Sequence, residues 1–94
     1  MSDYPDPSAL LKLQTLPAMT RDQCLEVLEE ARTMWVVEHG CYCVEADSYH
    51  FNTGGWSGNE EIIDALQRNA MFWARCWEMS KRGGEHVFRL PEEE

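Results

Sequence analysis

The hydrophobic pattern of the chain changes its period twice, at Gly40 and at Gly54. Before Gly40 the apolar residues recur every three or four positions, which is the spacing of one face of an α-helix. Between Cys41 and Thr53 that spacing is lost, and the segment is rich in the aromatic and β-branched residues that strands prefer. After the glycine-rich stretch the helical spacing returns. These changes predict an α+β fold.

Two helices are expected before the first change of period. The longer one is placed at Arg21–Glu38, because Thr20 and Gln23 have the spacing of a capping box. A shorter helix is expected over Ala9–Thr15, with Ser8 as its N-cap residue. Both carry apolar residues that can dock on a common core.

The segment after Gly40 predicts a hairpin. Two short strands, Cys41–Glu45 and Tyr49–Asn52, would flank a turn at residues 46–48. A single long bent strand is the alternative. A further strand is expected at Glu85–Leu90, where apolar and polar residues alternate before Pro91.

The longest predicted helix covers Asn59–Lys81 and ends at Gly83 and Gly84. Its apolar residues occupy more than half of the helix circumference, which indicates burial on more than one side. These residues are Ile62, Ile63, Leu66, Ala70, Met71, Phe72, Trp73, Ala74, Cys76, Trp77 and Met79. The second side is expected to face a partner or another copy of the chain. Together with an uncovered sheet edge, this face predicts a homodimer.

The length of the chain limits its architecture. Its 94 residues, of which 44% are hydrophobic, suffice for one modest core and one domain, residues 1–94. We expect two or three short antiparallel strands with the two main helices packed on one face. No apolar run approaches the roughly 20 residues that cross a bilayer, and the first residues lack the basic start of a signal peptide. A cytoplasmic protein with reduced thiols is therefore expected.

The stretch GGWSGNEEII, which begins at Gly54, is expected to start the long helix. Its glycines let the chain turn from a strand into a helix. Ser57 and Glu60 have the spacing of a second capping box, and Asn59 is an alternative cap residue. A nucleophilic serine is disfavoured, because the GxSxG pattern is incomplete and the chain is too short for the hydrolase scaffold that uses it.

A ligand site is the alternative interpretation of the same stretch. A glycine-rich turn before a helix exposes backbone N–H groups to an anion, so a nucleotide phosphate could bind there beside the tryptophan ring. The residues of this alternative are Gly54, Gly55, Trp56, Ser57 and Arg75, with Arg89 as a second candidate cation. The spacing matches no common phosphate-binding motif, and the acidic residues of the first helical turn would repel a phosphate.

A zinc site is a further alternative. His39, Cys41 and Cys43 alternate, so on a strand they would project from one face, and His50 or Cys24 could supply a fourth ligand. The spacing departs from the usual CxxC pairs. Cysteines also pack as small hydrophobic residues, and the leading interpretation includes no cofactor.

The net charge of −9 is the strongest indication of function. Such a surface repels nucleic acid and anionic lipid and attracts basic proteins. Carboxylates form a stripe on the helix after Thr20, which consists of Asp22, Glu26, Glu29, Glu30 and Glu38. An ordinary solvated helix face is the competing interpretation. The functional one is a row of charges that imitates the phosphate backbone of DNA.

The second half of the chain resembles small phage and prophage proteins without an assigned activity. The resemblance covers residues 51–90 and rests on GGWSG at Gly54, on Phe72-Trp73, on RGG at Arg82, and on HVF at His86. It implies a bacterial cytoplasm during infection. In size and acidity the chain is also similar to anti-CRISPR inhibitors.

These observations predict a non-enzymatic, phage-type inhibitor of a host defence protein, CRISPR-like or otherwise nucleic-acid-handling. It would bind a basic protein surface through the carboxylate stripe, as a possible DNA mimic, and would bind neither nucleic acid nor membrane. A binder of an anionic nucleotide or of zinc is the alternative. No set of acid, base and nucleophile indicates an enzyme.

Overall fold

The computed structural model describes residues 4–92 and has the expected α+β fold. Along the chain the elements are α1 (Pro7–Thr15), α2 (Arg21–Met34), β1 (Cys41–Glu45), β2 (Ser48–Asn52), α3 (Ser57–Arg68), α4 (Ala70–Cys76), β3 (Trp77–Lys81) and β4 (Glu85–Arg89). The described chain therefore has four helices and four strands, where the sequence predicted one short helix, two main helices and two or three strands.

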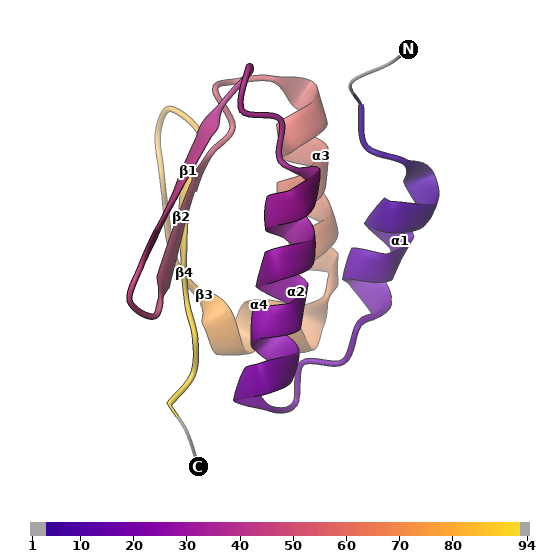
Figure 1. Ribbon diagram of the computed structural model, residues 1–94, viewed down its shortest axis with the longest axis vertical. Helices are drawn as coiled ribbons and strands as arrows, with labels where there is room; N and C mark the ends of the chain where they lie inside the picture. Colours follow the sequence, from indigo (N-terminus) through magenta and orange to yellow (C-terminus); the bar gives the residue numbers. More distant parts are fainter. Residues whose placement is uncertain (1–3, 93–94) are drawn as a thin grey trace.

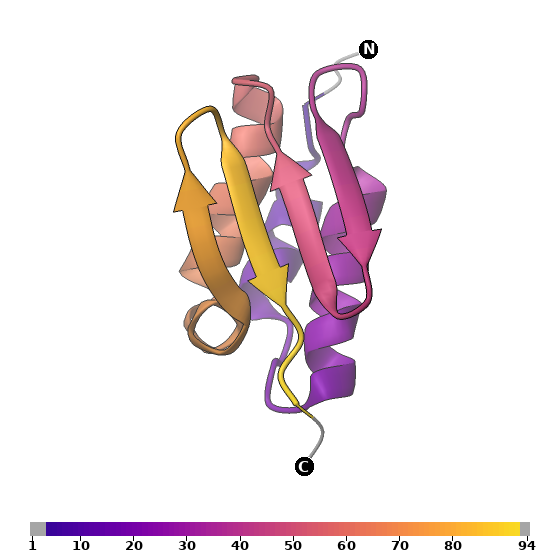
Figure 2. The ribbon, with the colours of Figure 1, turned by 90° about the vertical axis from the view of Figure 1, so that its left-hand side faces the viewer.

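The four strands form one antiparallel sheet in the order β1-β2-β4-β3. All helices lie on one face of this sheet, and the other face is open (Figure 2). α2, α3 and α4 face the sheet, and α1 packs on the side of α2 and α3 that points away from it (Figure 1).

Aromatic side chains fill the space between the sheet and the helices. Phe51 of β2, Phe88 of β4 and Phe72 of α4 are almost completely buried. The ring centroids of Phe51 and Phe88 are 6.0 Å apart, and those of Phe72 and Phe88 are 5.5 Å apart. Burying rings of this size supplies much of the hydrophobic stabilisation of so small a domain.

The predicted hairpin is confirmed. β1 and β2 pair from Cys41 opposite Asn52 to Glu45 opposite Ser48, around a two-residue turn in which Ala46 has a φ of 52°. The alternative of one long bent strand is therefore wrong. The turn is one residue shorter than expected, because the second strand already begins at Ser48.

The capping box of α2 is confirmed, but the helix ends four residues earlier than predicted. It stops at Met34 rather than Glu38, and Trp35 is already extended. The reason is distant in sequence: the side chain of Asn59 accepts a 3.1 Å hydrogen bond from the N–H of Val36 and donates one of 3.2 Å to its carbonyl. This pairing replaces the hydrogen bonds that another helical turn would have made.

The start of α1 also differs from the prediction. Asp6, not Ser8, is the N-cap residue, and the helix begins at Pro7. A carboxylate oxygen of Asp6 accepts from the N–H of Ser8 at 3.3 Å. Proline is favoured at the first helical position because its missing N–H would have no helical partner there.

The predicted helix over Asn59–Lys81 is wrong in its second half. The helix breaks at Asn69, resumes as α4, and gives way to β3 at Trp77. The side-chain oxygen of Asn69 accepts from the N–H of Phe72 and so caps α4, while its amide nitrogen donates to the carbonyls of Leu13 and Leu16, both at 2.9 Å. One buried amide thus fixes the helix break and ties it to α1.

Gly83 and Gly84 do not end a helix but form the turn of the β3–β4 hairpin, with φ values of 87° and 84°. The wide helical face that suggested a homodimer is consequently absent. Met71 and Met79 are 46% and 40% exposed, whereas Phe72 and Cys76 are buried in the core of the same chain. Both edges of the sheet, β1 and β3, remain uncovered in the part of the chain that the structure describes.

Candidate functional site

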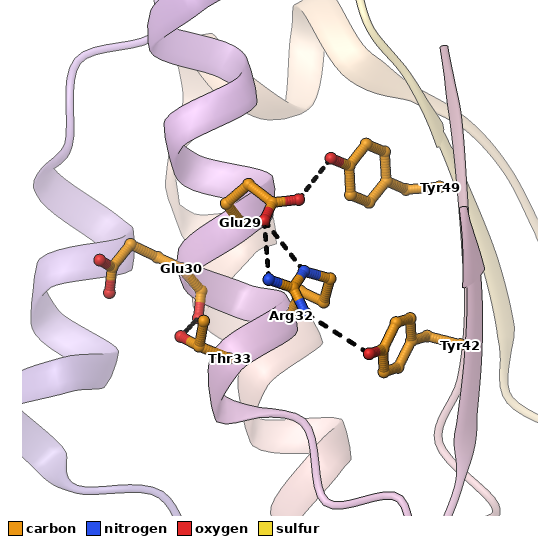
Figure 3. A network of polar contacts seen from close by, with 6 residues as sticks. All are labelled: Glu29, Glu30, Arg32, Thr33, Tyr42 and Tyr49. Atoms are coloured by element: carbon orange, nitrogen blue, oxygen red, sulfur yellow. Dashed lines mark hydrogen bonds and ion pairs between the residues drawn. The ribbon is translucent and has the colours of Figure 1, made fainter. Parts of the chain in front are cut away.

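The carboxylate stripe of α2 divides into residues that make internal contacts and residues that face solvent. Glu29 belongs to the first group (Figure 3). One oxygen of its carboxylate lies 2.9 Å from Nη2 of Arg32, and the other accepts a 2.6 Å hydrogen bond from the hydroxyl of Tyr49 in β2. Arg32 also donates to the hydroxyl of Tyr42 in β1, at 3.4 Å. These contacts join α2 to the sheet.

The same contacts shift the acidity of two groups. The hydrogen bond from Arg32 and then the one from Tyr49 lower the pKa of Glu29 below its usual value. Burial, followed by the hydrogen bond to Glu29, raises the pKa of Tyr49 to about 12. Glu29 is therefore held as a carboxylate and Tyr49 as a neutral hydroxyl, which is the pair of states that their hydrogen bond requires.

Glu30 faces the other neighbour of α2. Its carboxylate lies 3.2 Å from Nζ of Lys12 in α1. This pair is partly exposed, so it contributes little to stability, but it neutralises one charge of the predicted stripe.

Asp22 and Glu26 remain exposed on the solvent side of α2, and neither forms an ion pair with any of residues 4–92. They are four positions apart, so their carboxylates follow one another along one face of the helix. Glu38 is also exposed, but it lies beyond the end of α2, in the loop that leads to β1. The structure therefore brings together two of the five predicted residues as a free acidic surface.

A junction that the sequence did not reveal lies beside this acidic surface, at the start of α2. Arg21, at the start of α2, forms an ion pair with Asp47 in the β1–β2 turn and donates a 2.7 Å hydrogen bond to the carbonyl of Pro91. It thereby holds the hairpin turn and the segment after β4 beside the first turn of α2. Asp22 and Glu92 adjoin this junction in the chain, and both are exposed. Asp47 and Pro91 are 26 and 70 positions from Arg21 in the sequence, so no local pattern indicates these contacts.

The glycine-rich stretch does precede a helix, but neither predicted cap is used. Trp56 is the N-cap residue of α3, and within residues 4–92 no side chain makes a capping hydrogen bond there. Ser57 is the first helical residue, and the side chain of Glu60 instead accepts a 3.4 Å hydrogen bond from the hydroxyl of Thr53. Asn59 is buried and binds the loop after α2, as described above.

The ring of Trp56 is packed against residues of the chain itself. It stacks on the ring of His39 with centroids 4.3 Å apart, and the ring of Tyr4 lies 5.0 Å away at a tilt. A Cβ atom on Gly58 would meet the indole ring at 2.2 Å, so this glycine is needed for close packing. The hydroxyls of Tyr4 and Ser57 share a 2.7 Å hydrogen bond.

The structure does not bring Arg75 to the glycine-rich stretch. That stretch precedes α3, whereas Arg75 lies in α4, at the opposite end of α3 (Figure 1). Arg75 and Arg89 instead line a hollow of about 320 Å³ beside the start of β3. Glu78 and Glu92 line the same hollow, so its charges of opposite sign offset one another.

The structure also separates the residues of the predicted zinc site. Cys41 and Cys43 are exposed in β1, whereas His39 precedes the strand and stacks on Trp56. The strand register places Cys43 opposite His50. No group of three or more metal-binding side chains is close enough together within residues 4–92 to hold an ion.

A shallow hollow lies along the β1–β2 hairpin. Its volume is about 280 Å³. It is lined by Cys41, Tyr42, Cys43, Glu45, His50, Phe51, Asn52 and Glu85. Both exposed thiols thus border a single depression at the edge strand β1.

Among the helices of the described residues, none has the length and apolar character required to cross a lipid bilayer. The chain matches no protein-family model, no curated protein and no solved structure.

Proposed function

We propose that this protein is a non-enzymatic binding protein that contacts a basic surface of a second protein through the exposed carboxylates of α2. The observation that carries the proposal is the position of Asp22 and Glu26, which are exposed and form no ion pair with residues 4–92. Carboxylates that are free of internal partners lose the least when they bind an external cation.

Two other carboxylates of the predicted stripe have a structural role. Glu29 and Glu30 are engaged with Arg32 and Lys12, so they support the helix that presents the free carboxylates. Glu92 follows the Arg21 junction in the chain but lines a hollow with Arg75 and Arg89, so it does not belong to the free carboxylates of α2. We therefore assign the contact to Asp22 and Glu26, and not to the five predicted residues as one row.

The chemistry of the partner follows from the charge. A protein whose surface holds nucleic acid presents arginine and lysine at the spacing of phosphates. A chain with a net charge of −9 is drawn to such a surface and competes with the nucleic acid for it. The proposed role is thus inhibition by occupancy, and the likeness to small phage proteins in residues 51–90 supports a host defence protein as the target.

The test compares two variants that change the net charge by the same amount at different places. Asp22→Lys/Glu26→Lys reverses the proposed contact. Glu61→Lys/Glu78→Lys is the matched control, since both of its positions are exposed and lie on α3 and β3. Each tagged protein is used to capture partners from bacterial lysate at low and at moderate salt, with and without duplex DNA.

We expect the wild type and the control variant to capture the same partner. Asp22→Lys/Glu26→Lys should not capture it. Capture should fall as salt screens the charges and should fall when duplex DNA is added. A partner retained equally by both variants, or one that DNA does not displace, would contradict the proposal. Circular dichroism and urea denaturation of both variants verify that the fold is unchanged.

A further inference from the structure

The edge strand β1 carries two exposed thiols on one side. Cys41 and Cys43 are opposite Asn52 and His50 of β2, whereas Tyr42, between them, is opposite the buried Phe51. Side chains of paired residues lie on the same face of a sheet. Tyr42 therefore faces the helices, where it packs against the core, and the two thiols face the open side shown in Figure 2.

The outer edge of β1 has backbone groups available for another strand. Glu45 and Ser48 flank a two-residue turn, so they form a hydrogen-bonded pair, and such pairs alternate along an antiparallel hairpin. Cys41 and Cys43 hence bond to β2, while Tyr42 and Val44 direct their N–H and C=O groups away from it. β1 lies at the end of the strand order, so no described strand uses these groups.

We propose that β1 pairs with β1 of a second copy in an antiparallel, two-fold symmetric register with Tyr42 opposite Tyr42. In that register Cys41 lies opposite Cys43 of the second copy, and the symmetry produces the same pair twice. These are positions without a direct hydrogen bond, where Cα atoms are about 4.5 Å apart, which is within the range that a disulfide spans. The dimer is closed by two equivalent disulfide bonds.

The charges of the strand favour this register over its neighbours. It places Glu45 opposite position 39, in the turn that precedes β1 of the second copy, and so keeps Glu45 of one copy away from Glu45 of the other. Since each copy has a net charge of −9, backbone pairing alone would be opposed by repulsion. The covalent bonds make the pairing persistent. The proposal does not depend on the acidic contact of α2, which lies outside the paired strands.

The reaction requires an oxidant, for which a small disulfide such as oxidised glutathione suffices. The thiolate of Cys41 attacks one sulfur of the small disulfide and releases one small thiol. Cys43 of the second copy then attacks the sulfur of Cys41 in the mixed disulfide and releases the second small thiol. Each protein disulfide thus consumes two protein thiols and one small disulfide and yields two small thiols.

The experiment oxidises the full, reduced chain with oxidised glutathione and measures the products by intact mass and by non-reducing electrophoresis. We expect a covalent dimer that is four hydrogen masses lighter than two chains, consistent with two disulfides. Cys41→Ser and Cys43→Ser should each reduce the dimer by at least about tenfold, because either change removes one member of both pairs. A dimer that survives in Cys41→Ser but not in Cys43→Ser would instead indicate a pairing centred on Cys43 and would overturn the proposed register.

A backbone variant separates ordered strand pairing from random collision of exposed thiols. Val44→Pro removes an N–H that points away from β2, so it blocks the second copy while leaving the hairpin bonds in place. It should lower the dimer as far as Cys41→Ser does, with both thiols still reactive towards Ellman's reagent. Val44→Lys, which opposes edge pairing by its charge, serves the same purpose if the proline variant does not fold.

Other products would overturn the proposal. An oxidised monomer would indicate a bond between Cys41 and Cys43 of one chain, and mixed disulfides with glutathione alone would indicate that the thiols never meet. A dimer that persists in reductant and dissociates with a chelator would indicate a shared metal ion. Undiminished dimer in both Val44 variants would indicate collision without strand pairing.

Discussion

The hydroxyl of Tyr49 donates a 2.6 Å hydrogen bond to the carboxylate of Glu29, and this contact connects β2 to the middle of α2. The same carboxylate binds Arg32, one helical turn further along. A residue that belongs to an acidic surface by its sequence is therefore part of the contact between the helical layer and the sheet. Replacing Glu29 should therefore lower the stability of the fold, whether or not a binding partner is present.

Tyr49→Phe should lower the free energy of unfolding by about 1–2 kcal/mol at pH 7, because it removes a hydrogen bond to a charged group. Tyr42→Phe is the matched control. Its hydroxyl accepts from Arg32 at 3.4 Å, a weak contact, so the loss should be about half as large or less. Urea denaturation followed by circular dichroism measures both. Equal losses would contradict the role assigned to Tyr49.

The lowered pKa of Glu29 predicts a specific dependence of stability on pH. A carboxyl group that is more acidic in the folded state stabilises that state above its unfolded pKa, and this contribution is lost as the pH falls through the folded value. Hydrogen bonds from Arg32 and Tyr49 lower the pKa of Glu29 from 4.5. The stability difference between wild type and Glu29→Gln should therefore be largest near pH 7 and should shrink below about pH 4.5.

Glu26→Gln is the control for that pH profile, since Glu26 is exposed on the same helix and has no ion pair within the described chain. Its curve should run parallel to that of the wild type. A Glu29→Gln difference that stays constant from pH 7 to pH 3 would show that the carboxylate contacts do not stabilise the fold.

Asn69→Ala should be among the most destabilising single changes of a polar residue in the helical layer, because Asn69 is buried. It removes the cap of α4 and leaves the carbonyls of Leu13 and Leu16 without their donor. The expected loss is about 2–4 kcal/mol. Asn69→Ser keeps an oxygen that can cap the helix, so it should lose less. Thermal and urea denaturation measure both, and a loss under roughly 0.5 kcal/mol for the alanine variant would refute this account.

Gly58→Ala tests the packing of Trp56. Glycine to alanine within a helix normally gains up to about 1 kcal/mol. Here the new methyl group would meet the indole ring at 2.2 Å, so we expect a net loss of about 1 kcal/mol. In a Trp56→Ala background the same change should become stabilising. The double-mutant cycle is the measurement, and a gain in both backgrounds would show that the ring moves aside without cost.

The four thiols should react in two classes. Cys41 and Cys43 are exposed, whereas Cys24 and Cys76 are 0% and 2% exposed. Burial, and then the contact with Cys24, also raises the pKa of Cys76, so less of its reactive thiolate is present. Ellman's reagent should therefore modify two thiols rapidly in the native protein and all four in denaturant. Rapid reaction of a third native thiol would contradict the described core.

The elements that could be predicted from the sequence are those specified by neighbouring residues. The capping box at Thr20 and the hairpin from Cys41 to Asn52 are defined by contacts within a few positions. The early end of α2 and the break at Asn69 depend on hydrogen bonds to residues more than 20 positions away. An assignment based on the spacing of apolar residues treats such asparagines as ordinary polar residues of a helix face.

In the candidate site, too, the sequence predicts what depends on neighbouring residues and misses what depends on distant contacts. Acidity and helical spacing correctly place the carboxylates of Asp22 to Glu30 on one helix. Which of them remain free is decided by Tyr49, Arg32 and Lys12, whose positions depend on the packed sheet and on α1. In the fold, the break at Asn69 did carry a local signal that could have been used, because asparagine is a favoured N-cap residue.

The pairing of β3 has a consequence for the order in which the parts of the chain fold. Trp77 and Met79 continue the helical spacing of Trp73 and Cys76, yet residues 77–81 form an edge strand whose pairing partner is β4. That partner is synthesised later than they are. On the ribosome, residues 77–81 lack this pairing strand until residues 85–89 emerge, so we expect their strand conformation to form only after β4 has been synthesised.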